Sequence, residues 1–132
     1  RAVSPDSLAG SNYGIRIAQL ELCGAEALTT SHKRYLRVPA IMNGWNLVSV
    51  AAMCKTNTTH FHVALKNGAT SMLTVDISIE DGEFDTMTNA ATPPVINTAE
   101  DDVATGDQLE LSVTTAGAAI TYLVIELGFQ LP

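Results

Sequence analysis

The stretch SMLTVDISIE, residues 71–80, decides the fold class. Its apolar residues alternate strictly with polar ones, and they are Leu73, Val75, Ile77 and Ile79. A period of two predicts one continuous strand with one face in a core and the other face, including Ser78, in solvent. Asp81-Gly82 follows at once, and this pair tolerates the positive φ of a tight turn.

Similar signals run through most of the 132-residue chain. They predict strands over residues 13–22, with a β-bulge near Ala18-Gln19, and over residues 33–38, 45–54, 60–66, 109–114 and 120–131. The stretch 45–54 is apolar on both faces, which favours a central, covered strand. Turn signals stand at Asn43-Gly44 and at Gly106-Asp107. Helical signal is confined to residues 98–104, where one turn is expected.

These patterns predict a single all-β domain, an antiparallel β-sandwich of the jelly-roll type with about eight strands, over residues 13–132. An extended N-terminal arm over residues 1–12 precedes it. The predicted core comprises the inward residues of the strands, which are Phe61, Val63, Leu65, Leu73, Val75, Ile77, Ile79, Leu109, Leu111, Val113, Leu123, Ile125, Leu127, Phe129 and Leu131.

Charge is distributed unevenly along the chain. The net charge of −7 argues against nucleic acid as a partner, and the longest apolar run, residues 48–54, is too short to span a bilayer. Residues 1–66 carry seven cations and three acids, a net of +4, whereas residues 67–132 carry eleven acids and no cation. Both signs are therefore available for electrostatic docking.

Residues that could carry out catalysis are sparse. His60 and His62 share one strand face, but a metal site would need a third ligand such as His32, and we expect no metal. The acidic stretch 81–85 lacks the calcium-loop layout and is predicted to be a turn, whereas the acidic stretch 100–107 is predicted to be a helix cap beside a turn. The sequence has no nucleophile elbow and no phosphate loop. We therefore expect a protein that is not an enzyme and has no cofactor.

Four further residues each allow two interpretations. Asn57 begins a glycosylation sequon, although a turn is the expected role without a secretory signal. Trp45 could stack on a sugar, but a lone Trp that opens an apolar strand is expected in the core. Cys23 and Cys54 are predicted to be buried free thiols, and a disulfide between them remains the alternative.

Four segments carry a resemblance to a known group of proteins. They are YLRVPAIMNGWNLVSV at residues 35–50, TPPVIN at residues 92–97, DDVATGD at residues 101–107 and GFQLP at residues 128–132. Together they resemble the jelly-roll structural proteins of tailed-bacteriophage virions, of the capsid decoration (cement), head-fibre or tail-fibre-associated type. The resemblance spans about residues 35–132, although 60–90 match only in strand pattern, and residues 1–30 match nothing. These motifs are architectural and include no reactive residue.

The resemblance implies a virion role. The leading expectation is a capsid decoration or cement protein on the outer surface of the head, assembled in the host cytoplasm. Its partners would be the major capsid protein and other copies of itself, as a dimer or trimer, with no nucleic acid and no membrane. The alternative is a receptor- or carbohydrate-binding module of a fibre or baseplate, with Tyr13, Tyr35, Trp45 and Tyr122 as stacking residues. A cupin-type metalloprotein would rest on His60 and His62 alone.

The densest positive charge predicts a docking surface. Lys33, Arg34 and Arg37 lie within five positions just before Pro39. They could dock on an acidic capsid surface or on the acidic half of a neighbouring copy, because rim charges speed the encounter between partners. The competing interpretation is a strand edge whose charges block edge-to-edge pairing.

Overall fold

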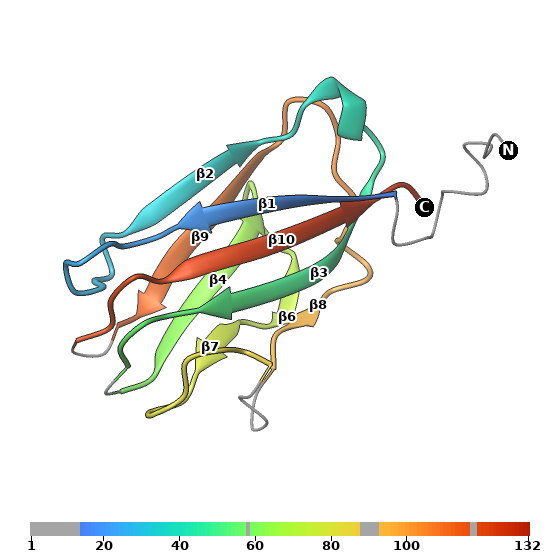
Figure 1. Ribbon diagram of the computed structural model, residues 1–132. Helices are drawn as coiled ribbons and strands as arrows, with labels where there is room; N and C mark the ends of the chain where they lie inside the picture. Colours follow the sequence, from blue (N-terminus) through green and yellow to red (C-terminus); the bar gives the residue numbers. More distant parts are fainter. Residues whose placement is uncertain (1–13, 58, 88–92, 117–118) are drawn as a thin grey trace, which may run out of the picture.

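The computed structural model describes residues 14–57, 59–87, 93–116 and 119–132 (Figure 1), so the predicted arm over residues 1–12 lies outside the described part. Within it the chain is all-β, with ten strands and one short 3₁₀ helix, Ala40–Met42. The strands are β1 (Ile15–Glu21), β2 (Lys33–Arg37), β3 (Asn46–Met53), β4 (Phe61–Asn67), β5 (Thr70–Ser71), β6 (Leu73–Val75), β7 (Ile77–Ile79), β8 (Val95–Ile96), β9 (Gln108–Thr115) and β10 (Val124–Gln130).

The strands form two main antiparallel sheets and a small ribbon. Sheet A has the order β1-β10-β3, and it lies in front in Figure 1. Sheet B has the order β2-β9-β4, with β5 and β7 both paired to β4, while β6 pairs with β8. The strands β1 to β4 alternate between the two sheets. β10 lies between β1 and β3 in sheet A, and β9 lies between β2 and β4 in sheet B. The predicted fold class, an all-β antiparallel sandwich, is therefore confirmed.

The core lies between the two sheets. Phe61, Val63 and Leu65 of β4 are fully buried, as alternation along the strand predicts. Leu109, Leu111 and Val113 of β9 are buried beside them. Sheet A contributes the inward residues of β10, which are Ile125, Leu127 and Phe129.

The strand predicted over residues 71–80 is divided into three short strands. Met72 leaves the ladder, is fully buried and donates its N–H to Leu65 O at 2.9 Å. Val75 is 37% exposed, contrary to prediction, because β6 pairs with β8 instead of sheet B. Ser78 was predicted to face solvent and is 3% exposed. All three residues of β7 are buried, so this strand is covered on both faces.

Two predictions about sheet A were also wrong. The register of β1 with β10 is continuous, so no bulge lies at Ala18-Gln19. The register shift in sheet A lies between Gly128 and Phe129, where β10 pairs with β3. The apparent change of phase arises because two apolar residues of β1, Ile15 and Ile17, belong to its outer face. β3 is an end strand of sheet A, with Val48 and Met53 exposed, and not a central strand covered on both sides.

The remaining differences concern the ends of elements. The helical turn expected over residues 98–104 is absent, and Asp102 instead forms a β-bridge with Asn46. Leu131 is 42% exposed because β10 ends at Gln130. The predicted turn at Asp81-Gly82 is confirmed, with Gly82 at a φ of 81°. No helix in the described part of the chain is long and apolar enough to cross a membrane.

Candidate functional site

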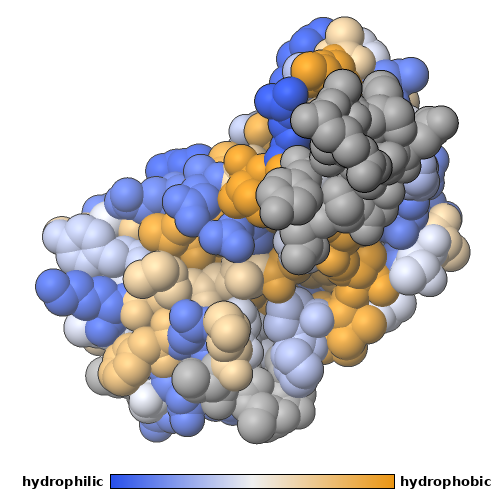
Figure 2. Space-filling view, turned by 45° about the vertical axis from the view of Figure 1, so that its right-hand side comes forward, coloured by the Kyte–Doolittle hydropathy of each residue, from blue (hydrophilic) through white to orange (hydrophobic). Residues whose placement is uncertain are grey.

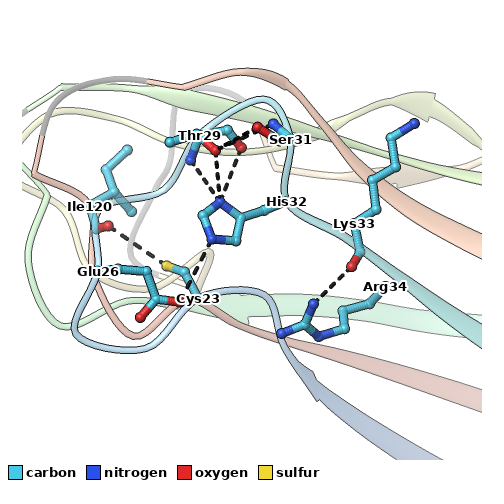
Figure 3. Close-up of polar contacts among 8 residues, drawn as sticks. All are labelled: Cys23, Glu26, Thr29, Ser31, His32, Lys33, Arg34 and Ile120. Carbon is cyan, nitrogen blue, oxygen red and sulfur yellow. Dashed lines mark hydrogen bonds and ion pairs between the residues drawn. The ribbon is translucent and has the colours of Figure 1, made fainter.

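The three cations of the predicted docking surface, Lys33, Arg34 and Arg37, all lie on β2 but do not share a face. Lys33 is paired with Ser112 of β9, whereas Arg34 is paired with the buried Leu111. Directly paired residues point to the same side of a sheet, so Arg34 points to the core side. Lys33 and Arg37, an even number of positions apart, point outward. Figure 3 shows the Lys33 and Arg34 side chains extending in different directions.

Arg34 lies along the open edge of the sandwich. β1 and β2 are the end strands of their sheets. A groove of about 220 Å³ includes residues of both, with Arg16, Leu36 and Arg37 in its lining. Arg16 is paired with the buried Phe129, so it also points to the core side. Inward charges on end strands prevent pairing with another sheet, which favours the edge-protection interpretation for Arg34.

The outward side of sheet B is basic, and we call its residues Lys33, Tyr35, Arg37, Lys66 and Glu110 the basic face. Tyr35 is 60% exposed and stands between the two cations of β2. Glu110 is paired with both Tyr35 and Lys66. Its Oε1 lies 3.7 Å from Lys33 Nζ, but a surface ion pair of this kind contributes little free energy. Three cations and one carboxylate leave this face net positive.

The outward side of sheet A has the opposite charge, and we call it the acidic face. Its carboxylates are Glu21 and Glu126, and Glu126 Oε2 accepts a hydrogen bond of 2.9 Å from Gln19 Nε2. In the fully described strands β1, β3 and β10 the only cation is Arg16, which points to the core side. This face is therefore net negative.

The acidic face contains a shallow apolar hollow of about 140 Å³. Its apolar lining residues are Ala51, Ala52, Met53, Met87 and Val124, and its polar ones are Gln19, Asp85 and Glu126. Met87 is 89% exposed and Met53 is 53% exposed. In Figure 2 apolar surface, orange and tan, lies exposed among hydrophilic residues. Methionine side chains adapt to the shape of a partner and are frequent at binding surfaces.

Sequence alone could have found part of these two faces. The alternation Lys33, Tyr35, Arg37 is visible in the sequence and places the three on one side of a strand. The hollow is not visible there, because Met53 and Met87 are far apart in sequence. They come together because Met53 forms a β-bridge with Asp85.

The histidines do not gather into a metal site. The rings of His60 and His62 lie edge to face with their centroids 5.7 Å apart. His32, the suggested third ligand, is engaged elsewhere: its Nδ1 accepts a 2.9 Å hydrogen bond from Thr29 N (Figure 3). Among the residues that the structure describes, no group of three or more His, Cys, Asp or Glu could hold a metal ion.

The loop around His32 is held by local polar contacts. His32 Nε2 lies 3.7 Å from Glu26 Oε1 (Figure 3). Backbone N–H groups of Glu26 and Gly24 lower the pKa of the Glu26 carboxyl, and the charge of His32 lowers it further. These contacts join residues of the loop that precedes β2, so they hold the shape of that loop.

The two acidic stretches serve the backbone. Asp85 Oδ1 accepts the N–H of Met87 at 2.8 Å, which orients the methionine that lines the hollow. Asp107 Oδ2 accepts the N–H of Ala104 at 3.0 Å and the Nδ2 of Asn67 at 2.8 Å. The turn predicted for residues 81–85 is confirmed, and so is the turn beside the second stretch, at Thr105-Gly106. The helix cap predicted for the second stretch is wrong, because no helix forms there.

Asn57, the first residue of the sequon, is buried. It is 5% exposed, and its Nδ2 donates to the carbonyl oxygens of Ile79, Glu80 and Glu83 at 3.3, 2.6 and 3.1 Å. It therefore tethers the end of β7 and the following turn. A side chain held in this way is not presented for glycosylation.

Cys23 and Cys54 are buried free thiols, as predicted. Cys23 Sγ donates to Ile120 O at 3.7 Å (Figure 3). Burial raises the pKa of Cys54 to about 11, and the pKa of Cys23 is also raised, mainly by burial. A raised pKa lowers the thiolate fraction at neutral pH, so both thiols are weak nucleophiles in the folded protein.

The aromatic residues suggested for sugar stacking are dispersed. Trp45 packs against the core, as expected. Tyr35 lies on sheet B, and Tyr122 precedes β10 with a positive φ of 51°. Tyr13 is outside the described residues. The described aromatics therefore do not build one stacking platform.

The fold is similar to that of a protein in the capsid asymmetric unit of cyanophage Pam1. The likeness covers 100% of this chain and 94% of that chain, with a TM-score of 0.52 and 14% sequence identity. At this identity the likeness shows the fold. No protein-family model matches the sequence, and no curated protein matches it either.

Proposed function

We propose that this chain is a structural protein of a bacteriophage virion. One observation carries the proposal: the whole chain shares its fold with nearly the whole of a chain in a cyanophage capsid. The resemblance of residues 35–50 and of the segments after residue 92 to phage virion proteins supports the same role independently. Within that role, we favour a capsid decoration or cement protein on the outer surface of the head, without enzymatic activity or a cofactor.

The chemistry of the surface fits a protein that works through protein contacts. Asp85 and Asp107 accept backbone hydrogen bonds in turns, and the two charged faces present cations on sheet B and carboxylates on sheet A. The partners proposed are the major capsid protein and further copies of this chain. The net charge of −7 and the negative acidic face would repel nucleic acid, because its phosphates are also negative.

Copy number tests this proposal. The chain would be quantified by mass spectrometry in purified particles, relative to the major capsid protein. A cement protein is expected in a ratio near one copy per major capsid protein or per small group of them. A handful of copies per particle would contradict the cement role and favour a fibre or baseplate module, and absence from the particle would contradict the virion role.

Attachment to the head tests the predicted docking residues. Reversing Lys33 and Arg37 to Glu should slow attachment to undecorated particles, and the remaining rate should depend less on salt. Arg34→Glu changes the charge by the same amount as either single reversal, Lys33→Glu or Arg37→Glu, but on the opposite side of the same strand. It is therefore the matched control for these two single variants. Equal rates for all variants at low and moderate salt would exclude the basic face as the docking surface.

A further inference from the structure

The two outer faces of the sandwich complement one another in charge. The basic face has three cations against Glu110, whereas the acidic face has Glu21 and Glu126. Opposite potentials on two surfaces steer them together, and like potentials keep them apart. Two copies would therefore repel one another when identical faces meet and attract when unlike faces meet.

The two faces also complement one another in shape. Tyr35 is the one large exposed apolar side chain on the described outward part of sheet B. The hollow on the acidic face is about 140 Å³, and a cavity of about 150 Å³ lined by apolar side chains is large enough for a benzene ring. A phenol ring would bury Met53, Met87 and Val124, while its hydroxyl would meet the carboxylate of Glu126 at the rim.

We propose that the basic face of one copy binds the acidic face of a second copy, with Tyr35 seated in the hollow between Met53 and Met87. Lys33 and Arg37 flank Tyr35 at about 7 Å along the strand on either side. The carboxylates stand beside the hollow: Glu126 lines it, and Glu21 is paired with Val124, which also lines it. The cations of one copy thus meet the carboxylates of the other around a buried aromatic ring.

This contact has consequences for assembly. It joins two different surfaces, so it is heterologous, and each added copy leaves one basic and one acidic face free. Successive copies form a closed ring if the rotation between them closes, and an open filament if it does not. The inference deepens the proposed function, on which its biological setting rests, by naming the surfaces through which copies associate.

Charge reversal separates this contact from a symmetric one. Reversing Glu21 and Glu126 to Lys makes both faces positive, and reversing Lys33 and Arg37 to Glu makes both negative. Each double variant should associate at least about tenfold more weakly in sedimentation velocity, because like charges then face one another around the aromatic ring. The variant that carries all four reversals should associate again, and so should a mixture of the two double variants.

Tyr35→Ala tests the aromatic ring without changing charge. It should also weaken association about tenfold or more, since interface tyrosines are frequent hot spots. Ile41→Ala is the matched control: Ile41 is 59% exposed, close to the 60% of Tyr35, and lies in the 3₁₀ helix outside both faces. Circular dichroism would establish that each variant folds.

Three results would overturn the inference. One is a wild-type protein that stays monomeric at high concentration, and another is a fourfold reversal that does not recover association. The third is a Tyr35→Ala variant that associates as well as Ile41→Ala does. All are measured on the isolated protein, so they leave the copy number in the virion, and with it the proposed function, to be decided separately.

Discussion

Gly128→Ala would test how closely the three strands of sheet A pack on the acidic face. Gly128 is buried in β10 between Ile17 of β1 and Ser49 of β3. A Cβ built at this position would overlap Ser49 Oγ and would lie 3.2 Å from Ile17 Cδ1 and 3.4 Å from Ile15 Cγ2. The neighbouring side chains therefore occupy the space that any larger residue needs.

Two effects of opposite sign determine the change in stability. Overpacking a tight site costs about 1–3 kcal/mol. Replacing glycine stabilises by about 0.4–1 kcal/mol, because alanine has less conformational entropy to lose from the unfolded state. The Ser49 hydroxyl can rotate, which relieves part of the overlap. We expect Gly128→Ala to lower the free energy of unfolding by about 1–2 kcal/mol.

Urea unfolding would measure this change, at a protein concentration too low for association. With a typical slope for a small domain, the midpoint should fall by roughly half to one molar. Ser49→Ala removes only the overlapping oxygen and should have little effect by itself. Combined with Gly128→Ala it should recover most of the loss, which gives a positive coupling in a double-mutant cycle. A Gly128→Ala protein as stable as the wild type, or a double variant with no recovery, would refute this account.

Three other predictions concern the core and its polar supports. Ile77→Ala should lower the free energy of unfolding by about 2–5 kcal/mol in urea, because Ile77 is fully buried, whereas the exposed Thr70→Ala should cost under about 0.5 kcal/mol. Asn57→Asp should cost more than Asn57→Ala in the same assay, since a carboxylate would face three carbonyl oxygens that now accept hydrogen bonds. The pKa of Cys54 is about 9 in the unfolded chain and about 11 in the folded protein, so its contribution to stability should be complete below pH 9 and decline as pH rises towards 11. Cys54→Ala should flatten that decline in melting temperature with pH. An unchanged slope in this variant would show that another group causes the decline.

The sequence predicted the fold class and most of the core because alternation along a strand is a local property. Phe61, Val63 and Leu65 follow it without exception, and all are buried as predicted. The errors at Val75 and Ser78 arose where the chain changed its pairing partner. Val75 and Ser78 continue the same alternation, but the chain passes from β6, paired with β8, to β7, paired with β4. No local pattern records such a change, because strand pairing is set by residues distant in sequence.

The candidate site was predictable to a similar extent. The cluster Lys33, Arg34 and Arg37 was found from its density of charge alone. The period of two then places Lys33 and Arg37 on the outward side of β2 and Arg34 on the core side. The position of Tyr35 between two outward cations follows from the same period of two. The hollow that could receive it needed three dimensions, because Met87 reaches it from a loop.

The opposite charge of the two faces does not come from the uneven distribution of charge along the chain. Glu21 lies in the basic first half of the sequence, yet it belongs to the acidic face. Glu110 lies in the acidic second half, yet it stands on the basic face between Lys33 and Lys66. The interleaved strand order distributes both halves over both sheets, and the phase of each strand then decides which charges point outward. Because a shift of one residue in phase would turn Lys33 and Arg37 inward and Arg34 outward, the character of the basic face depends on the register of β2 against β9.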